Sequence, residues 1–238
     1  HTAVILDDGN VKVWGKNQNG QLGQGNRTQL GYYASDMGDN LTRVDLGTGK
    51  TAVAIAAGTE HTAVILNDGS VKAWGLNTYG QLGLGHTEHM GNDADEMGDD
   101  LSAVDLGTGR TAVAIAAGNS ITGVILDDGT VKVWGFNSSG ALGQEHYNNI
   151  GDDPGEMGDN LTRVDLGTGK TAVDIAIGGN HVVVLLNDGT IKAWGYNGNG
   201  ELGQGRDDNQ IGEETGDMGD NLPTTNLPDG LTAIGVAA

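Results

Sequence analysis

The chain has 238 residues, among them 43 glycines, one phenylalanine and no cysteine, so disulfides and thiolate metal sites are excluded. Its formal net charge of −20 opposes binding to the phosphate backbone of a nucleic acid. The longest apolar runs, such as Ala52–Ala57 and Val182–Leu186, are too short to cross a membrane. We therefore expect neither nucleic acid nor a membrane as a partner.

The acidity itself has two interpretations. A strongly negative surface suits a salty or extracellular setting or a cationic partner. It also keeps a glycine-rich β protein from associating non-specifically. The compartment is not identified by any targeting segment, and the acidity favours an extracellular one. The chain begins at His1 in the middle of a sequence pattern, so we expect it to be a piece of a longer chain.

One segment, Val11–Gly23, recurs three more times and divides the chain into four similar units. The only tryptophans lie 60 residues apart, and so do four Asn-x-x-Gly steps; these positions are Trp14, Trp74, Trp134, Trp194, Asn17, Asn77, Asn137 and Asn197. A period of this length predicts a solenoid or a propeller. The units are 1–60, 61–120, 121–180 and 181–238, and we expect one repeat domain because each unit needs its neighbours to complete a core.

Each unit opens with a predicted β-hairpin. In the first copy, His1–Leu6 and Val11–Trp14 flank Asp7-Asp8-Gly9, and Asp-Gly supplies the positive φ that a tight hairpin turn demands. Period-2 alternation places the valines and the tryptophan on the buried face. The same alternation predicts that four lysines point to solvent, namely Lys12, Lys72, Lys132 and Lys192.

The second half of each unit is a long loop followed by two short strands. We expect the Asn side chain of each Asn-x-x-Gly step to bond the backbone of its own turn, and Leu22 and its equivalents to fill the space between units. Arg43–Leu46 is predicted as a short edge strand. Ala52–Ala57 consists of small residues, as the crowded innermost strand of a propeller blade requires.

These features together resemble the regulator of chromosome condensation (RCC1-like) repeat, a family of β-propellers. The matching residues in the second copy are Ala57-Gly58, His61-Thr62, Trp74-Gly75, Asn77, Gly80 and Leu82-Gly83. The resemblance implies an all-β protein whose blades are four-stranded antiparallel sheets, normally seven to a ring. It also implies that His1, His61 and His181 stabilise the turn at a strand entry; the third copy has Ile121 there.

The chain departs from that family in having four units. Its last residues, 234–238, match an inner strand without a hairpin, and its first residues match a hairpin without an inner strand. The two ends therefore either complete one blade and close a ring, or belong to a longer array. An open arc would leave an unpaired face at each end, to be covered by another copy.

Acidic loops are the candidate metal sites, because clustered carboxylates can bind Ca²⁺ through their oxygens. The candidates are Asp95, Glu96, Asp99, Asp152, Asp153, Glu156, Asp159, Asp217 and Asp220. Their spacing fits no helix–loop–helix calcium site. The alternative is that the Asp of each Met-Gly-Asp step caps backbone groups and holds the loop. No other cofactor is expected.

Four Asn-x-Ser/Thr triplets are possible glycosylation sites in predicted loops or turns, at Asn26, Asn40, Asn137 and Asn160. No constellation of catalytic residues recurs or breaks the repeat, so we expect no enzyme, no catalytic residues and no cofactor-binding residues.

We therefore predict a non-enzymatic scaffold that binds a protein partner or further copies of itself. Two alternatives stay open. Family resemblance alone suggests a guanine-nucleotide exchange factor or regulator of a small GTPase. The acidic loops suggest an extracellular structural or adhesive protein that holds Ca²⁺.

Overall fold

The computed structural model describes residues 1–205, 208–228 and 230–238. Within these ranges the regular elements are β-strands and five short 3-10 turns, and all strand pairs are antiparallel. None of the described helical turns has the length and apolar character that a membrane span requires. The all-β prediction is therefore confirmed.

The strands form four separate sheets, and each sheet follows the order of the chain. In the last three sheets the first strand comes from the end of one unit and pairs with the hairpin of the next. The sheets are β1 (Thr2–Ile5) and β2 (Val11–Trp14); β3 (Ala52–Ala57), β4 (His61–Leu66) and β5 (Val71–Gly75); β6 (Ala112–Ala117), β7 (Ile121–Leu126) and β8 (Val131–Gly135); β9 (Ala172–Ile177), β10 (His181–Leu186), β11 (Ile191–Tyr196) and β12 (Gln210–Ile211). The 3-10 turns lie in the long loops, at Ala34–Asp36, Gly38–Asn40, Gly98–Asp100, Gly158–Asn160 and Gly219–Asn221.

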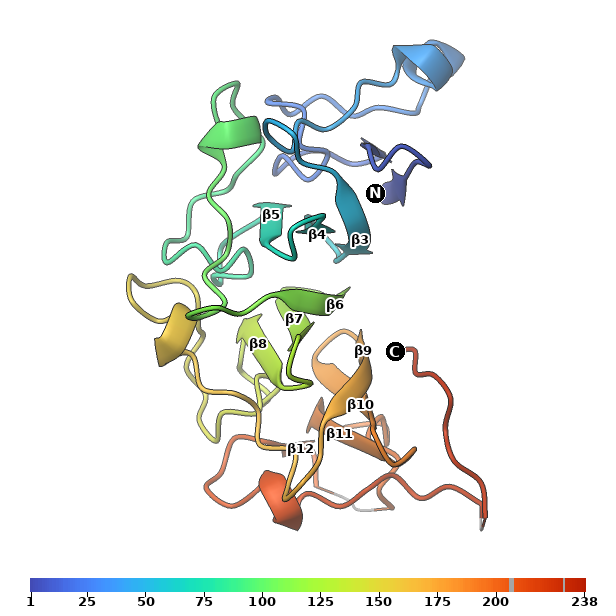
Figure 1. The fold of residues 1–238 in the computed structure, drawn as a ribbon, viewed down its shortest axis with the longest axis vertical. Helices are drawn as coiled ribbons and strands as arrows, with labels where there is room; N and C mark the ends of the chain where they lie inside the picture. Colours follow the sequence, from blue (N-terminus) through green and yellow to red (C-terminus); the bar gives the residue numbers. More distant parts are fainter. Residues whose placement is uncertain (206–207, 229) are drawn as a thin grey trace.

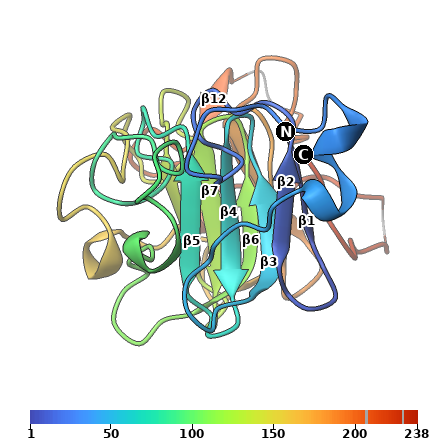
Figure 2. The same cartoon turned by 90° about the horizontal axis from the view of Figure 1, so that it is seen from above.

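The sheets follow one another in an open arc, from the first unit at the top of Figure 1 to the fourth at the bottom. Seen along that direction, the sheets overlap and the loops surround them (Figure 2). The strands β3, β6 and β9 lie next to one another on one side of the arc, as expected for inner strands. Val53, Val113 and Val173 on these strands are 63%, 61% and 57% exposed because they face the open side.

The two ends of the chain do not complete a common blade. Residues 234–238 form no strand, and Ile234 at their start is 99% exposed. The hairpin of β1 and β2 accordingly stands without an inner strand. Of the architectures that the repeat allowed, the described residues adopt the open arc.

The hairpin turns form as predicted. Gly9 and Gly129 both have φ of +76°, in the left-handed region that Asp-Gly turns require. The preceding Asp8 accepts a hydrogen bond from the backbone N–H of Asn10 at 3.0 Å, which fixes the turn from its own side chain.

The prediction of four strands in every sheet is wrong for the described residues of the first three units. Their fourth position holds a single β-bridge, for example between Gly75 and Met90, and only the last sheet gains the short strand β12. In all four units a glycine with positive φ, such as Gly91 at +85° or Gly212 at +109°, directly follows this pairing and turns the chain away from the edge. The last sheet differs by the additional pair of Tyr196 with Gln210.

The predicted strand at Arg43–Leu46 is also wrong. This segment lies extended beside β2, but its ladder is reduced to the bond from Val44 N–H to the Val11 carbonyl at 2.9 Å. Burial of Val44 and Leu46, each 4% exposed, holds the segment in place without a regular ladder.

The hydrophobic core lies between the units rather than within them. One cluster joins Val11, Leu22 and Val44 of the first unit to Trp74 and Met97 of the second. Trp74, Trp134 and Trp194 are fully buried, whereas Trp14, which has no unit before it, is partly exposed. The predicted place of Leu22 between units is confirmed.

We predict that Leu142→Ala lowers the free energy of unfolding by about 2–5 kcal/mol, because Leu142 is fully buried and the substitution leaves a cavity. Urea unfolding followed by tryptophan fluorescence measures this. The control Leu231→Ala, at a side chain that is 66% exposed, should change it by less than about 0.5 kcal/mol. Equal effects of the two substitutions would contradict a core between units.

Candidate functional site

The junctions between successive units contain most of the buried polar chemistry. At each junction the indole N–H of one unit donates to a carbonyl of the preceding unit: Trp74 to Gln21 at 3.1 Å, and Trp134 to Gln81 at 3.1 Å. Trp194 does the same to Ala141 at 3.0 Å. The regular spacing of the tryptophans thus reflects an indole N–H donor that the second, third and fourth units each supply to the unit before.

A histidine and a threonine extend this bond at the first two junctions. Thr122 Oγ1 donates to the Gln81 carbonyl at 2.8 Å, so its remaining contact, with His61 Nε2 at 2.8 Å, requires His61 to donate. His61 Nδ1 is then the unprotonated nitrogen, and it is buried without a partner in the described structure. Burial lowers the pKa of His61 to about 4.

The third junction lacks both members of this pair. Ile121 stands where His61 stands in the second unit, and Val182 stands where Thr122 stands in the third. Ile121 and Val182 are both fully buried. An apolar pair replaces a hydrogen-bonded pair, so no buried polar group is left alone. The histidines therefore stabilise the junctions between units, a wider role than stabilising a turn.

The Asp of the Met-Gly-Asp step bonds the preceding unit in the second, third and fourth units. Asp99 accepts from Thr48 N–H at 2.8 Å and from Thr48 Oγ1 at 2.6 Å. Asp159 bonds Thr108 in the same way, and Asp220 bonds Thr168. The hydrogen bonds from threonine hold the pKa of Asp99 below its usual range.

The prediction that the repeated lysines point to solvent is wrong. Lys72, Lys132 and Lys192 are 7%, 5% and 4% exposed. The Nζ of Lys132 donates to the Leu106 carbonyl at 3.0 Å and the Gly158 carbonyl at 2.6 Å, which lie in successive units. Strand alternation failed here because the loops of two units cover this face of the sheet. Burial lowers the pKa of all three lysines.

The asparagines of the Asn-x-x-Gly steps bond their own turns as predicted. Asn17 Oδ1 accepts from Leu22 N–H at 2.9 Å, and Asn17 Nδ2 donates to the carbonyls of Asn26 and Thr28. Asn77, Asn137 and Asn197 accept the equivalent bond from the leucine five residues later.

The candidate metal ligands are not gathered around one point. Within the described ranges no three His, Cys, Asp or Glu side chains are placed to hold a metal ion. Glu96 Oε2 accepts from the N–H groups of Asn92 and Asp93, both at 2.9 Å. Glu156 and Asp217 hold their own loops in the same way. Asp95 and Asp153 are exposed, and burial raises the pKa of Asp152.

One of the four glycosylation predictions is wrong. Asn137 is fully buried, and its side chain is engaged in the turn described above, so a glycan has no room there. Asn26, Asn40 and Asn160 are exposed, and each donates its amide to a nearby carbonyl of its own loop.

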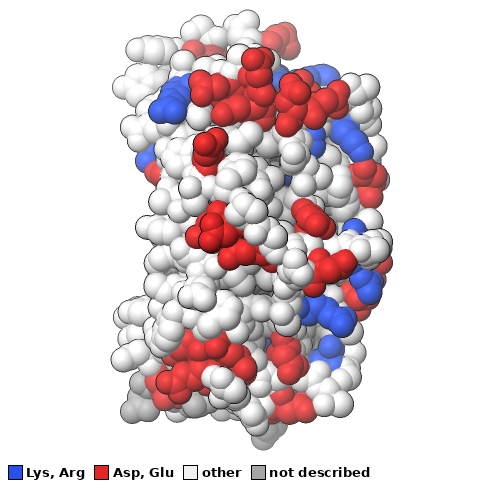
Figure 3. Space-filling model, turned by 90° about the vertical axis from the view of Figure 1, so that its left-hand side faces the viewer, with Lys and Arg blue, Asp and Glu red and all other residues white. Residues whose placement is uncertain are grey.

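The acidic side chains lie on the surface in separate groups and not in one continuous patch. Figure 3 shows these groups spaced along the face that carries the loops, with basic side chains along the right-hand edge of the view and at its upper left. Arginine and lysine therefore interrupt an otherwise acidic surface.

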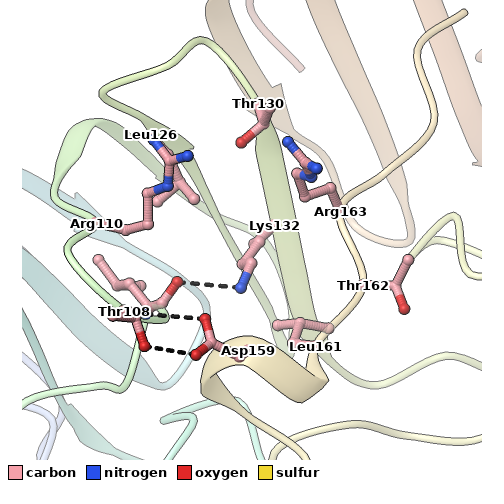
Figure 4. A pocket seen from close by; sticks show the side chains of 10 residues that line it. Thr108, Arg110, Leu126, Thr130, Lys132, Asp159, Leu161, Thr162 and Arg163 are labelled. Carbon is pink, nitrogen blue, oxygen red and sulfur yellow. Dashed lines mark hydrogen bonds between the residues drawn. The ribbon is translucent and has the colours of Figure 1, made fainter.

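A cavity of about 400 Å³ opens at the second junction. Figure 4 shows Arg110 and Arg163 on opposite sides of it, with Lys132 between them and Asp159 bonded to Thr108 below. Units two and three both contribute to its wall, so the cavity exists only when they are packed together.

Two family models, both described as the regulator of chromosome condensation (RCC1) repeat, match this chain. One covers residues 1–21, 52–81 and 172–201, and the other covers residues 68–96. The chain belongs to the RCC1-like repeat family. The resemblance inferred from the Trp-Gly and Asn-x-x-Gly steps is thereby confirmed.

Curated relatives of this RCC1-like chain are longer than it is. It is 28% identical over 209 residues to the ultraviolet-B receptor UVR8 of Arabidopsis thaliana, covering 86% of this chain and 41% of the receptor. It is 31% identical over 206 residues to the probable E3 ubiquitin-protein ligase HERC3 of Homo sapiens, covering 86% of this chain and 17% of the ligase. This chain thus spans less than half the length of either relative.

A solved structure shows the same fold. Prp20p of Saccharomyces cerevisiae superposes with a TM-score of 0.66 at 18% identity, covering 94% of this chain and 48% of Prp20p. The blade architecture of this RCC1-like chain is therefore that of a propeller, although its sheets form an open arc here.

Sequence reasoning about the RCC1-like repeats missed the junction roles of Lys132 and of the Thr108–Asp159 pair. The sequence contains a signal for this pair, because every threonine of a Gly-Thr-Gly turn is followed in the next unit by the aspartate of a Met-Gly-Asp step. The paired change to Ile121 and Val182 is a similar signal. Nothing in the period alone indicates that the lysines are covered, since that depends on how the loops fold back.

We predict that Lys132→Met lowers the free energy of unfolding by about 2–3 kcal/mol, because two buried carbonyls lose a charged donor. Chemical denaturation measures the change. The control Lys16→Met removes an exposed ion pair with Glu60 and should cost less than about 1 kcal/mol. A loss no larger than that of the control would contradict the bridging role.

We predict that stability falls on acidification partly through His61. Its folded pKa of about 4 lies below the unfolded value of 6.5, so the unfolded chain binds the proton first as the pH falls. His61 should therefore destabilise the fold by about 2–3 kcal/mol between pH 7 and 4.5. Urea midpoints of the wild type and His61→Gln over this range test it; His86→Gln, in a loop, serves as the control. Parallel pH profiles for wild type and His61→Gln would overturn the assignment.

Proposed function

We propose that this chain is a non-enzymatic scaffold that binds proteins through its loop faces and binds further copies of itself through its end units. The proposal rests on the side-chain hydrogen bonds that join successive units at their junctions. Indole, threonine, aspartate and lysine side chains hold the described units together, and the indole and aspartate groups of the first unit have no such partner among the described residues.

The first unit presents one half of a junction. Asp39 is equivalent to Asp99, but no described residue donates a hydrogen bond to it. Thr2, equivalent to Thr62, is exposed, and Trp14 is partly exposed. In the second unit the equivalent groups contact the first unit, so this face of the first unit carries the residues of one half of a junction.

The fourth unit presents the other half. A Cβ placed on Gly200 would meet open space, whereas one on Gly80 would lie 2.3 Å from the backbone nitrogen of Asp152 in the next unit. His181 is equivalent to His61 and is partly exposed. The two ends are complementary, so they support head-to-tail association between copies.

Relatives support a role in binding proteins. The structure of Prp20p was studied together with its binding to Gsp1p and histones. Resemblance to the RCC1-like family suggests the second candidate, a regulator or exchange factor of a small GTPase. Exchange at the intrinsic rate on a panel of small GTPases would count against this candidate.

A calcium-dependent structural role receives less support, because several candidate carboxylates already cap their own loops or bond the neighbouring unit. An unchanged melting temperature in millimolar Ca²⁺ would remove it. An extracellular setting, and a single repeat domain within a longer chain, stay predictions.

We predict that the mass measured by light scattering after size exclusion rises with protein concentration. Trp14→Phe removes an indole N–H that, like the indole N–H of Trp74, would donate to a backbone carbonyl of the preceding unit, here the fourth unit of another copy. It should therefore weaken association about tenfold. Its melting temperature should change little, because the side chain is only partly buried and an aromatic ring is retained.

The control is Asp7→Ala, which removes an exposed carboxylate from the hairpin turn and should leave association unchanged. A monomeric mass at every concentration would refute self-association. Equal weakening by Trp14→Phe and Asp7→Ala would show that the effect is not specific to the end face.

A further inference from the structure

The second junction differs from the other two at two positions beside its cavity. Arg110 stands where the first and third units carry Lys50 and Lys170. Arg163 stands where the second and fourth units carry Ala103 and Thr224. The repeat is therefore broken here, and two guanidinium groups flank one cavity (Figure 4).

Both guanidinium groups approach the same carboxylate oxygen. Arg110 lies 2.9 Å from Asp128 Oδ2, and Arg163 lies 3.9 Å from that atom. At the other junctions a single lysine pairs with the equivalent aspartate, Lys50 with Asp68 and Lys170 with Asp188. Among the described residues, two cations approach the same aspartate oxygen only in the third unit, where Arg110 also lies 3.5 Å from Asp127 Oδ1.

The first unit provides an internal control for this competition. Arg43 is equivalent to Arg163, and Asp8 is equivalent to Asp128. With no arginine from a preceding unit beside it, Arg43 lies 2.9 Å from Asp8 Oδ2. Arg110 has taken this position in the third unit, so Arg163 is displaced from its natural partner.

The displaced guanidinium is available to a ligand. The Arg163 side chain is 62% exposed, and no described residue accepts a hydrogen bond from it. Guanidinium presents a rigid pair of N–H donors that matches an oxyanion in two parallel bonds. Thr162 and Thr130 line the same cavity, and the Thr130 hydroxyl donates to Asp128 Oδ1 at 2.6 Å.

Charge selects the class of oxyanion. One free guanidinium balances one negative charge, which a carboxylate carries and a phosphate monoester exceeds. The other two cations of the cavity wall are already engaged, Arg110 by Asp127 and Asp128 and Lys132 by backbone carbonyls. Asp159 in the wall and the net charge of −20 oppose a second negative charge on the ligand. A carboxylate is therefore favoured over a phosphoryl group.

We propose that this cavity binds the carboxylate side chain of an acidic peptide segment of a partner protein, with Arg163 as the primary contact. The proposal rests on the proposed function as a protein-binding scaffold and names the chemistry that one surface recognises. The cavity of about 400 Å³ takes an acidic side chain and part of its backbone, and the broken repeat makes the site single in the described structure.

The test follows the Nε–H signal of Arg163 in ¹H–¹⁵N spectra of the whole chain. The probes are N-acetyl-glutamate N-methylamide, its glutamine counterpart, inorganic phosphate, and a short Gly/Ser peptide with one central glutamate. The glutamate probe should shift the signal saturably with a Kd of about 1–10 mM, and the peptide should bind more tightly because its backbone adds contacts. The glutamine probe should leave the signal unchanged.

Three variants sharpen the test, with backbone amide signals of Thr130 and Thr162 as the reporter. Arg163→Ala should abolish binding, while Arg43→Ala, at the equivalent position of the first unit, should leave it unchanged. Arg110→Ala should weaken it about tenfold, because Asp128 Oδ2 becomes free to pair with Arg163. Wild-type affinity in Arg110→Ala would overturn the competition argument.

Other outcomes overturn separate parts of the proposal. No saturable shift with either glutamate probe refutes the site. A stronger response to phosphate refutes the carboxylate class, and equal affinity of the single residue and the peptide refutes a peptide ligand. Light scattering on the same samples reports self-association independently, so failure of this site is distinguishable from failure of the scaffold function.

Discussion

The structure depends on the satisfaction of buried polar groups across the boundary between units. A carbonyl at each junction, such as that of Gln81, points away from its own sheet and needs a donor. The tryptophan of the next unit supplies that donor and at the same time fills the apolar space beside it. Since both needs are met by the neighbour, a unit has no complete core and no complete hydrogen bonding alone.

The same constraint explains which substitutions the repeat accommodates. At the third junction Ile121 and Val182 replace a histidine and a threonine together, and no polar atom is stranded. Replacement of one member alone would leave a buried donor or acceptor without its partner. Variation within the repeat is thus coupled across units rather than within them.

Regular positions hold the array together, and irregular positions are available for recognition. The threonine–aspartate and lysine–carbonyl bonds recur at all three junctions and leave little chemistry free. Arg110 and Arg163 depart from the pattern and leave one guanidinium without a bonded partner among the described residues. In a repeat protein, a break of this kind distinguishes one surface from its copies.

The amino-acid sequence by itself determined the repeat, the hairpins with their Asp-Gly turns, the self-bonding asparagines and the burial of the tryptophans. These features are local or periodic, so residue spacing carries them. Only the tertiary structure decided that Lys132 is buried, that Asn137 cannot carry a glycan and that Asp159 bonds the preceding unit. The physical reason is that each depends on a loop folding back over a neighbouring sheet, and spacing along the chain does not encode which faces that loop covers.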